Sequence, residues 1–395
     1  MEHKLSVKMI ILMFFIIPVM SSLILGYEMK ADVAMSIPTV VMDSDDSSFT
    51  RMFLDYVDDS AYFDIEEYAD SYDEVEDMIY KGKAYLGIII PENFYSDVLE
   101  GKAPVILTVY DGSTLPVIVS SKTSMTEILV TVKSAYMMNV YEGKQGIVPD
   151  RVMNYVQPID NATRILYNPT KSFRSFALPG MLGGIVQVAI AIGGAEIAVV
   201  SRGRKLGIFD HVRNIGAGAI LGTASVYAVM AVQWIVYGTP LRGTMLGFTI
   251  VTVLFALDIT CLGYIIGNIF TDRLFCTQLS CVLVLPTSIM GGYIFPVVAM
   301  PKVMQHIAKL LPFTYFSDTA RNTCLKPLEM HHLFDDMAFL LVFLAVEAAV
   351  LALVRYITGK YGTVGADESG NSGYSSVKSE STGRGSGSGE SGVTA

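Results

Sequence analysis

Three acidic residues lie inside long apolar stretches of this sequence: Glu196, Asp258 and Glu347. An ionisable side chain in a membrane-spanning segment is costly, and it usually faces a bundle interior or a water-filled cavity. Asp258 and Glu347 fall near the middle of their stretches, with no Lys or Arg at a similar depth. A series of such acids would be typical of a proton relay. Without a series, the sequence favours protonated side chains that are hydrogen-bonded between helices.

Metal, redox and nucleotide chemistry has little support in the chain. The four cysteines have neither metal-ligand spacing nor the pattern of a disulfide framework; they are Cys261, Cys276, Cys281 and Cys324. A phosphate-binding loop would read G-x-x-x-x-G-K-[ST], and no such run occurs. We therefore expect a non-catalytic chain that binds no metal, no cofactor and no nucleic acid.

The elements that position these residues are membrane helices. The chain is 52% hydrophobic and 17% charged, with a mean hydropathy of +0.47, which is more apolar than a soluble domain of this length. A helix needs about 20 mostly apolar residues to cross the hydrocarbon core. Six stretches meet this length: Met9–Tyr27, Phe176–Val200, Ile215–Tyr237, Thr244–Phe270, Leu274–Pro296 and Met337–Ile357. The sequence predicts a membrane all-α bundle of six transmembrane helices.

The basic residues predict the orientation of this bundle, because short loops rich in Lys and Arg stay in the cytoplasm. Arg202, Arg204 and Lys205 follow the second stretch, and Lys4 and Lys8 precede the first. The first stretch is interpreted as an uncleaved signal anchor, since no clear cleavage site follows it. With six helices, both termini are then cytoplasmic, and the long segment between the first two helices lies outside.

The outer segment is strongly acidic and has the pattern of an α/β domain. Residues 42–111 contain 18 Asp and Glu against 4 Lys and Arg, a net charge of −14, which favours solubility over a dedicated cation-binding surface. Extended segments are predicted at Thr39–Met42, Tyr85–Ile90 and Val105–Tyr110, and helices at Ser47–Val57, Ser71–Lys81, Glu92–Leu99 and Leu115–Tyr141. Their alternation predicts an extracytoplasmic α/β domain between helices 1 and 2.

A motif in the last third of the chain resembles a known family. Leu285–Pro296 reads LPTSIMGGYIFP, and it is followed by Ala299-Met300-Pro301 and by Leu311-Pro312-Phe313. This run is similar to the fifth-helix and external-hairpin signature of type-2 ABC exporter permeases. The resemblance extends through the outer domain and covers nearly the whole chain except the tail. It marks an outer gate signature at Pro286, Gly291, Gly292, Pro296, Pro301 and Pro312.

The resemblance implies a function and a set of partners. It implies the permease subunit of an ATP-binding-cassette exporter, which moves a substrate out across a prokaryotic plasma membrane. The partners implied are an ABC ATPase subunit that holds the ATP and magnesium, a second permease half in a homodimer or a paralogous heterodimer, and the lipid bilayer. Two other functions stay open: an energy-independent receptor or scaffold that uses the outer domain, and a proton-coupled transporter that uses Asp258 and Glu347.

The loop Ser201–Asn214 is predicted to couple ATP hydrolysis to this chain. It is the only sizeable ordered cytoplasmic loop expected, and it offers Phe209 and Val212 as apolar anchors. Arg202, Arg204 and Lys205 would supply polar contacts, although positive charges in such a loop can also serve only to set topology. The family usually shows Arg-Glu-x-Glu-x-Gly-Thr here. Arg202 and Gly207 fit that motif, whereas both Glu positions and the Thr do not.

The predicted domains follow from these assignments. Residues 1–27 form the cytoplasmic N-terminus and first helix, and residues 28–174 form the outer domain. Residues 175–360 form the five-helix domain, with an external re-entrant hairpin near 296–334, and residues 361–395 form a disordered cytoplasmic tail. Three G-x-x-x-G patterns predict close helix packing inside the bundle or at a dimer seam: Gly180–Gly184, Gly218–Gly222 and Gly263–Gly267.

The predicted topology can be tested by labelling single cysteines with a membrane-impermeant reagent. In a background without the native cysteines, Ser60→Cys is expected to react from the outside and Ser375→Cys only from the cytoplasmic side. Five of the six predicted helices separate the outer domain from the tail, and an odd number of crossings places the two on opposite sides. Reaction of both from the same side would contradict the six-helix topology.

Overall fold

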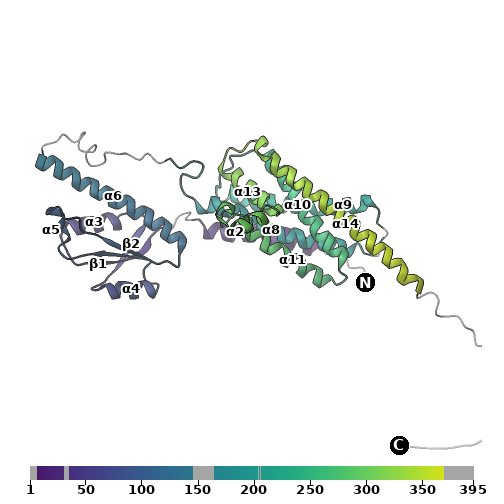
Figure 1. Ribbon diagram of the computed structural model, residues 1–395, viewed down its shortest axis with the longest axis horizontal. Coiled ribbons are helices and arrows are strands. Elements are labelled where there is room, and N and C mark those ends of the chain that lie inside the picture. Colours follow the sequence, from purple (N-terminus) through teal and green to yellow (C-terminus); the bar gives the residue numbers. More distant parts are fainter. Residues whose placement is uncertain (1–6, 31–34, 146–163, 203, 205, 369–395) are drawn as a thin grey trace, which may run out of the picture.

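The computed structural model describes residues 7–30, 35–145, 164–202, 204 and 206–368. An α/β domain and a bundle of long helices follow one another along the long axis of the molecule (Figure 1). Within the described residues, five helices are long and apolar enough to cross a membrane, and a sixth apolar helix of 17 residues is shorter. The predicted helical bundle with an α/β domain after its first helix is confirmed.

The membrane-length helices have the following bounds. The first span is α1 (Val7–Ile11), a π-helical turn η1 (Leu12–Ile16) and α2 (Ile17–Glu28). It is followed by α8 (Phe173–Val200), α9 (Ile208–Ile235), α10 (Met245–Ile269), α11 (Arg273–Ile289) and α14 (Phe334–Glu368). The shorter elements on the hairpin side are η2 (Val297–Ala299), α12 (Lys302–Ala308), α13 (Pro312–Leu325) and η3 (Met330–Leu333).

Three helix ends differ from the sequence-based expectation. α9 begins at Ile208 instead of Ile215, and α11 ends at Ile289 instead of Pro296. The end of α11 has a backbone cause, because Gly292 adopts a φ of 81°, which an α-helix does not accommodate. α14 continues to Glu368, so the first residues of the predicted tail are helical, and the rest of that tail lies outside the described residues.

The outer domain is a four-stranded sheet with helices on both faces. Its strands are β1 (Ile37–Asp43), β2 (Phe63–Tyr68), β3 (Leu86–Ile90) and β4 (Leu107–Tyr110), in the order β2-β1-β3-β4. β1 pairs in parallel with β2 and β3, and β4 is antiparallel to β3. The helices are α3 (Ser48–Asp58), α4 (Tyr72–Tyr80), α5 (Phe94–Leu99) and α6 (Leu115–Gln145). α3, α5 and α6 cover one face and α4 the other (Figure 1).

Strand β2 was not predicted from the sequence. It reads FDIEEY, and its three acidic residues obscure the apolar alternation that identifies a strand. Only Phe63 is buried in it, because β2 is the edge strand of the sheet beside β1. An edge position tolerates such charges, which also discourage pairing with another chain.

The bundle core depends on close backbone contact between α8 and α10. A Cβ atom at Gly263 would lie 2.0 Å from the carbonyl oxygen of Ala191, and one at Gly194 would lie 2.3 Å from that of Thr260. Side chains larger than hydrogen therefore do not fit at this crossing. The other predicted glycine patterns also face neighbours inside the chain: Gly180 meets Tyr293, Gly184 meets Ser288, Gly218 meets Thr260, and Gly222 meets Ile190. The patterns serve packing within the bundle.

The first span is joined to α9 by polar side chains. Pro18 has no N–H to donate to the carbonyl oxygen of Phe14 four residues earlier, and the hydroxyl of Ser225 donates to that oxygen instead, at 2.5 Å. One turn later along α9, the hydroxyl of Ser22 donates to Val229 O at 2.9 Å, and the amide of Gln233 donates to Ser22 O at 3.0 Å. Hydrogen bonds thus compensate for the broken helix and attach it to the bundle.

The α8–α10 contact generates a stability prediction. Gly263→Ala is expected to lower the free energy of unfolding by about 1–3 kcal/mol or more, because its methyl group meets backbone atoms that cannot move aside independently. Gly216→Ala on α9 is the control, since nothing lies within 4 Å of its Cβ position. Its expected effect is close to zero or slightly stabilising, because Ala is the better helix former. Unfolding in mixed detergent micelles would measure both, and equal effects would contradict the close contact.

Candidate functional site

The predicted coupling loop is shorter than expected. α8 ends at Val200 and α9 begins at Ile208, so Phe209 and Val212 belong to the first turns of a helix and not to a loop. The helix begins early because Asp210 accepts a hydrogen bond from the backbone N–H of Gly207 at 3.0 Å. Arg213 then pairs with Asp210 at 3.1 Å one turn further on.

The start of α9 carries exposed apolar side chains. Ile208 is 85% exposed, Phe209 78% and Val212 63%. Positions three and four residues apart share one face of a helix, so these three side chains form one surface, which we call the α9 patch. Arg204 is exposed beside it, and Lys205, which was predicted to act here, lies outside the described residues.

Arg202 does not point toward the α9 patch. Its guanidinium donates to the carbonyl oxygen of Gly267 at 2.5 Å, in the last turn of α10, and to that of Thr271 in the connection to α11. A contact of Arg202 with another protein stays a prediction, and within the chain Arg202 has a structural role. It ties the turn after α8 to the α10–α11 connection, a contact between residues that are 65 or more positions apart.

Glu196 is paired, unlike the other two intramembrane acids. The guanidinium of Arg273 donates to both carboxylate oxygens of Glu196 at 2.9 Å, and its third contact is 2.8 Å long. Thr277 on the next turn of α11 donates a weaker bond at 3.4 Å. The Glu196 side chain is only 6% exposed, so this charged pair fastens the C-terminal end of α8 to the start of α11.

Asp258 and Glu347 have no such partner. They lie beside each other, on α10 and α14, with exposed fractions of 0% and 6%. None of their four carboxyl oxygens has a hydrogen-bond partner among the described residues. For Asp258 the expected hydrogen bond between helices is not formed, and for Glu347 the candidate donor among the described residues is the thiol of Cys261 on α10. The nearest other titratable side chain is the thiol of Cys261, one turn along α10.

A polar cluster around one histidine, near the start of α9, escaped the sequence analysis. His211 Nδ1 lies 2.7 Å from the hydroxyl of Tyr264 and 3.2 Å from the guanidinium of Arg355. An arginine can only donate, so Nδ1 accepts and the ring proton is assigned to Nε2. The cluster joins α9, α10 and α14. A single histidine near a helix start gives no sequence signal for such a contact.

The outer gate signature forms the ends of the hairpin elements. Pro286 lies inside α11, Pro296 and Pro301 directly precede η2 and α12, and Pro312 is the first residue of α13. Proline is favourable at these starts, because its fixed φ suits the first helical turn and no N–H is needed there. The predicted hairpin thus consists of short helices.

Gly291 and Gly292 join this hairpin to the bundle. The carbonyl oxygen of Gly291 accepts from the hydroxyl of Ser317 at 2.5 Å, and that of Gly292 accepts from Arg321 at 3.0 Å. The Arg321 guanidinium also lies 5.2 Å from the ring centre of Phe176, at the outer start of α8. α13 therefore holds the end of α11 and the start of α8 together.

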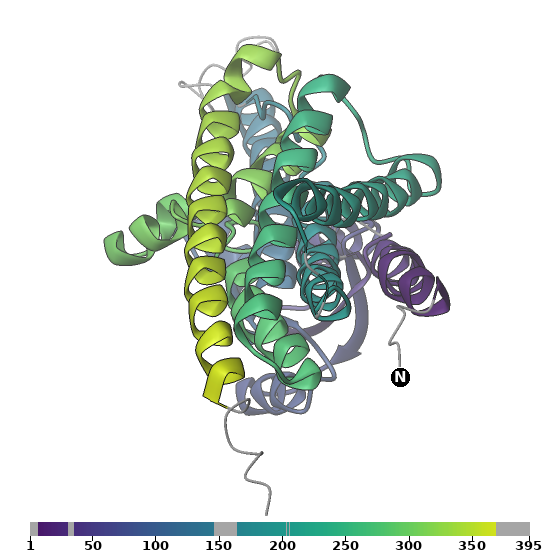
Figure 2. The ribbon, with the colours of Figure 1, turned by 90° about the vertical axis from the view of Figure 1, so that its right-hand side faces the viewer.

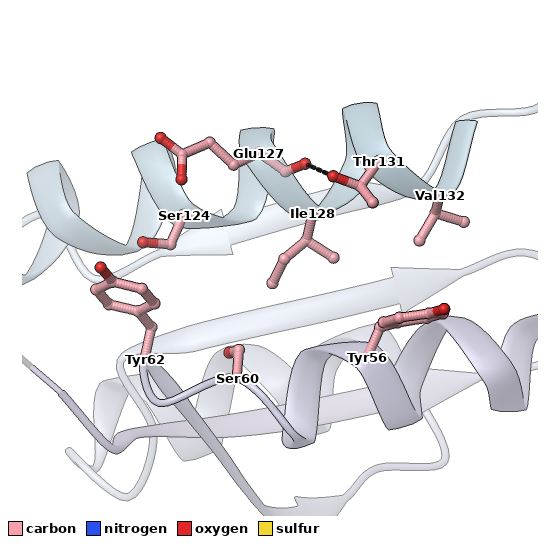
Figure 3. Close-up of a pocket in the computed structure, with 8 residues that line it drawn as sticks. All are labelled: Tyr56, Ser60, Tyr62, Ser124, Glu127, Ile128, Thr131 and Val132. Carbon is pink, nitrogen blue, oxygen red and sulfur yellow. Dashed lines mark hydrogen bonds between the residues drawn. The ribbon is translucent and has the colours of Figure 1, made fainter. Parts of the chain in front are cut away.

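The outer domain has a shallow pocket between α3 and α6. Its volume is about 190 Å³, and Figure 3 shows the lining side chains of Tyr56, Ser60, Tyr62, Ser124, Glu127, Ile128, Thr131 and Val132. Pockets for drug-sized ligands measure about 300–1,000 Å³. This pocket has room only for a small group.

Among the described residues, no three His, Cys, Asp or Glu side chains are placed to hold a metal ion. The arrangement instead consists of a helical bundle whose central helix is fastened at both ends to the helices around it, with an α/β domain outside the bundle. This is the architecture of a membrane-transport subunit.

Comparison with known proteins identifies the family. The chain matches the family described as ABC-2 family transporter protein over residues 8–356, and it therefore belongs to that family. It is a permease, the membrane-spanning component of a transporter in which a separate ATPase subunit hydrolyses ATP. No solved structure matches the chain significantly.

Three relatives come from Escherichia coli strain K12. The probable multidrug ABC transporter permease YbhR is 21% identical over 258 residues, which are 58% of this chain and 70% of YbhR. The inner membrane transport permease YhhJ is 23% identical over 264 residues, 63% of this chain and 67% of YhhJ. The probable multidrug permease YbhS is 25% identical over 177 residues, 42% of this chain and 46% of YbhS.

The pairing of Glu196 with Arg273 predicts an asymmetric effect of substitution. Arg273→Met is expected to lower the free energy of unfolding by at least about 2 kcal/mol, because it leaves the buried carboxylate unpaired. Adding Glu196→Gln should recover part of this loss. As a control, Lys81→Met removes the exposed pair with Asp77 and should cost less than about 1 kcal/mol. If the double variant lost as much free energy of unfolding as the two single variants together, Glu196 and Arg273 would not be an energetically coupled pair.

Proposed function

We propose that this permease is one half of an exporter in a prokaryotic plasma membrane, with both termini in the cytoplasm, and that its ATPase subunit docks on the α9 patch. The orientation is supported by the basic residues before the first helix and after α8, and by the acidic character of the outer domain. The α9 patch lies on the cytoplasmic side in this orientation, where an ATPase subunit has access to it.

The length of α9 is the observation that carries the docking proposal. Its 28 residues span about 42 Å, whereas the hydrocarbon core measures about 30 Å. The excess lies at the start of the helix, where Asp210 and Arg213 sit, and not at the far end, where Gln233 is buried against the first span. Ile208, Phe209 and Val212 are therefore apolar side chains exposed to water. A patch of this kind marks a site of protein contact.

The α9 patch lies close to contacts through which a displacement of α9 would move α8, α10 and α11. The turn before it is tied by Arg202 to the end of α10 and to the α10–α11 connection. Glu196 and Arg273 join the same end of α8 to α11. A displacement of α9 by a docked ATPase would be transmitted through these contacts to α8, α10 and α11.

The relatives support a substrate class and a dimer type. YbhR and YbhS carry names that describe them as probable multidrug permeases, which supports small apolar compounds as cargo of the present chain. Both of these permeases of one bacterium match this chain, which supports a paralogous second half over a second copy. ATP and magnesium would be held by the ATPase subunit, and this chain would bind neither.

Docking of the ATPase can be tested by replacing apolar side chains of the α9 patch with charged ones. Phe209→Asp together with Val212→Asp is expected to reduce co-purification of the ATPase at least about tenfold, which corresponds to about 1.4 kcal/mol of lost contact. The readout is the amount of ATPase recovered with the tagged permease from native membranes. Val105→Asp, at a 72% exposed position of the outer domain, is the matched control and should change nothing.

A second variant tests docking of the ATPase while it keeps the basic residues that set the membrane orientation of the permease. Arg204→Glu with Lys205→Glu tests the predicted polar contacts, while Arg202 and Arg213 remain to direct the loop to the cytoplasm. Both variants need a check of topology by cysteine labelling. Full ATPase recovery and full transport in the Phe209 and Val212 double variant would show that the ATPase docks elsewhere.

A further inference from the structure

The interface between α10 and α14 consists of two apolar clusters with a polar gap between them. The outer cluster contains Val251 of α10 and Leu340 of α14, together with Leu333 and Met337. The inner cluster contains Tyr264, Leu351 and Ala198. Asp258 comes seven residues after Val251, and Glu347 comes seven residues after Leu340. Seven residues make two helical turns, so both acids lie on the faces that join these helices.

The two acids are isolated from compensating charge. The titratable groups that act on Glu347 are Asp258 and the thiol of Cys261. Along α14, Arg355 lies eight residues away and Asp336 eleven residues away, about 12 and 16 Å at the helical rise. Both are engaged: Arg355 contacts His211 of α9, and Asp336 accepts from Thr319 of α13 at 3.2 Å.

The remaining elements around α10 supply no free counter-charge in the described part of the chain. Their charged residues near the bundle ends are paired with one another: Glu196 of α8 with Arg273 of α11, and Asp318 with Arg321, both of α13. η3 contributes His331, which contacts Glu329, and His332, which stacks on it. A charged Asp258 or Glu347 would therefore lose its hydration without gaining a counter-ion, at a cost of several kcal/mol each.

In the closed interface, only a very small ligand can compensate the negative charge of these two carboxylates. Asp258 is 0% exposed, so a substrate molecule or a hydrated ion has no access to it in this conformation. A metal ion would need further ligands, and no group of three suitable side chains occurs among the described residues. We propose that Asp258 and Glu347 form a proton-binding site that holds α10 and α14 together.

The chemistry of the site is reversible protonation. Each carboxylate takes up one proton from water, which forms an O–H bond and removes one negative charge. Each protonated group then carries an O–H donor in place of a charge. Separation of α14 from α10 would admit water and return the protons to it. The separated state thus binds fewer protons than the closed state.

α14 is placed to undergo such a separation. Of the residues in its most apolar stretch, only 22% are buried inside the chain, against 67% for α8. Figure 2 shows α14, in yellow, alongside α10, with the purple first span on the other side of the bundle in this view. Its main contacts are with α10, α13 and η3. Movement of α14 therefore breaks fewer contacts than movement of a central helix.

Infrared difference spectroscopy on the full-length permease in lipid nanodiscs tests the proposal directly. At about pH 7, the wild-type protein is expected to show the C=O stretch of protonated carboxylic acids. Asp258→Asn and Glu347→Gln should each remove about half of that band, because each removes one of two protonated groups. Asp55→Asn, an exposed acid on α3, is the control and should leave the band unchanged. A band that is absent, or that survives in both variants, would overturn the proposal.

Thermal unfolding provides an independent measurement of the same site. Because the closed state binds more protons, the wild-type Tm is expected to fall as the pH rises from about 6 to about 9, and the two single variants should show a smaller fall. A Tm that depends on sodium or potassium ions at constant pH would identify a cation site instead. Both measurements use the permease without an ATPase, so their failure would leave the proposed docking untouched, and a failure of docking would leave this site untouched.

Discussion

The backbone contact between α8 and α10 is the constraint on which the rest of the bundle depends. In a membrane, apolar surfaces gain little from leaving lipid, so helices associate through close packing and polar contacts. Gly194 and Gly263 let the two backbones touch, and Gly267 extends the contact by one turn. α8 is consequently the most buried of the long helices, and α9, α11 and α13 all pack against it. The positions of these helices depend on that of α8, and α14 is positioned through α10.

Both ends of α8 are fastened by charged or polar side chains. At the start of α8, Arg321 of α13 connects Phe176 to the end of α11. At the end of α8, Glu196 pairs with Arg273. Both connections reach α11, so the 17 residues of that helix link the two ends of α8.

The two peripheral helices are attached in opposite ways. The first span is joined to α9 by hydrogen bonds from Ser225, Gln233 and Ser22, and the bond from Ser225 satisfies the Phe14 carbonyl, to which Pro18 cannot donate. α14 is joined to α10 by two apolar clusters, and the acids between them lack partners. The first attachment is complete within the chain. In the interface between α14 and α10, the two acids are neutralised only when they bind protons. The attachment of α14 can therefore vary with protonation.

The sequence by itself determined the number and approximate positions of the membrane helices, the α/β character of the outer domain, and the family, through the run LPTSIMGGYIFP. Helix spans and caps depend on residues close together in the chain, so local patterns are sufficient to predict them. Strand β2 was the exception, because an edge strand carries charges that hide its period. The structure shows that Phe209 and Val212 are exposed, and their place on the cytoplasmic surface stays a prediction.

The tertiary structure decided which side chains meet. Glu196 and Asp258 look alike in the sequence, yet one is paired with Arg273 and the other faces Glu347, at separations of 77 and 89 residues. Arg202 looks like a surface charge and instead caps α10. Such roles depend on how helices cross. The crossing of α8 and α10 is set by glycines on each helix that contact backbone atoms of the other helix, far away in the chain. Local sequence contains the residues that can make these contacts, but only their packing selects the partner of each.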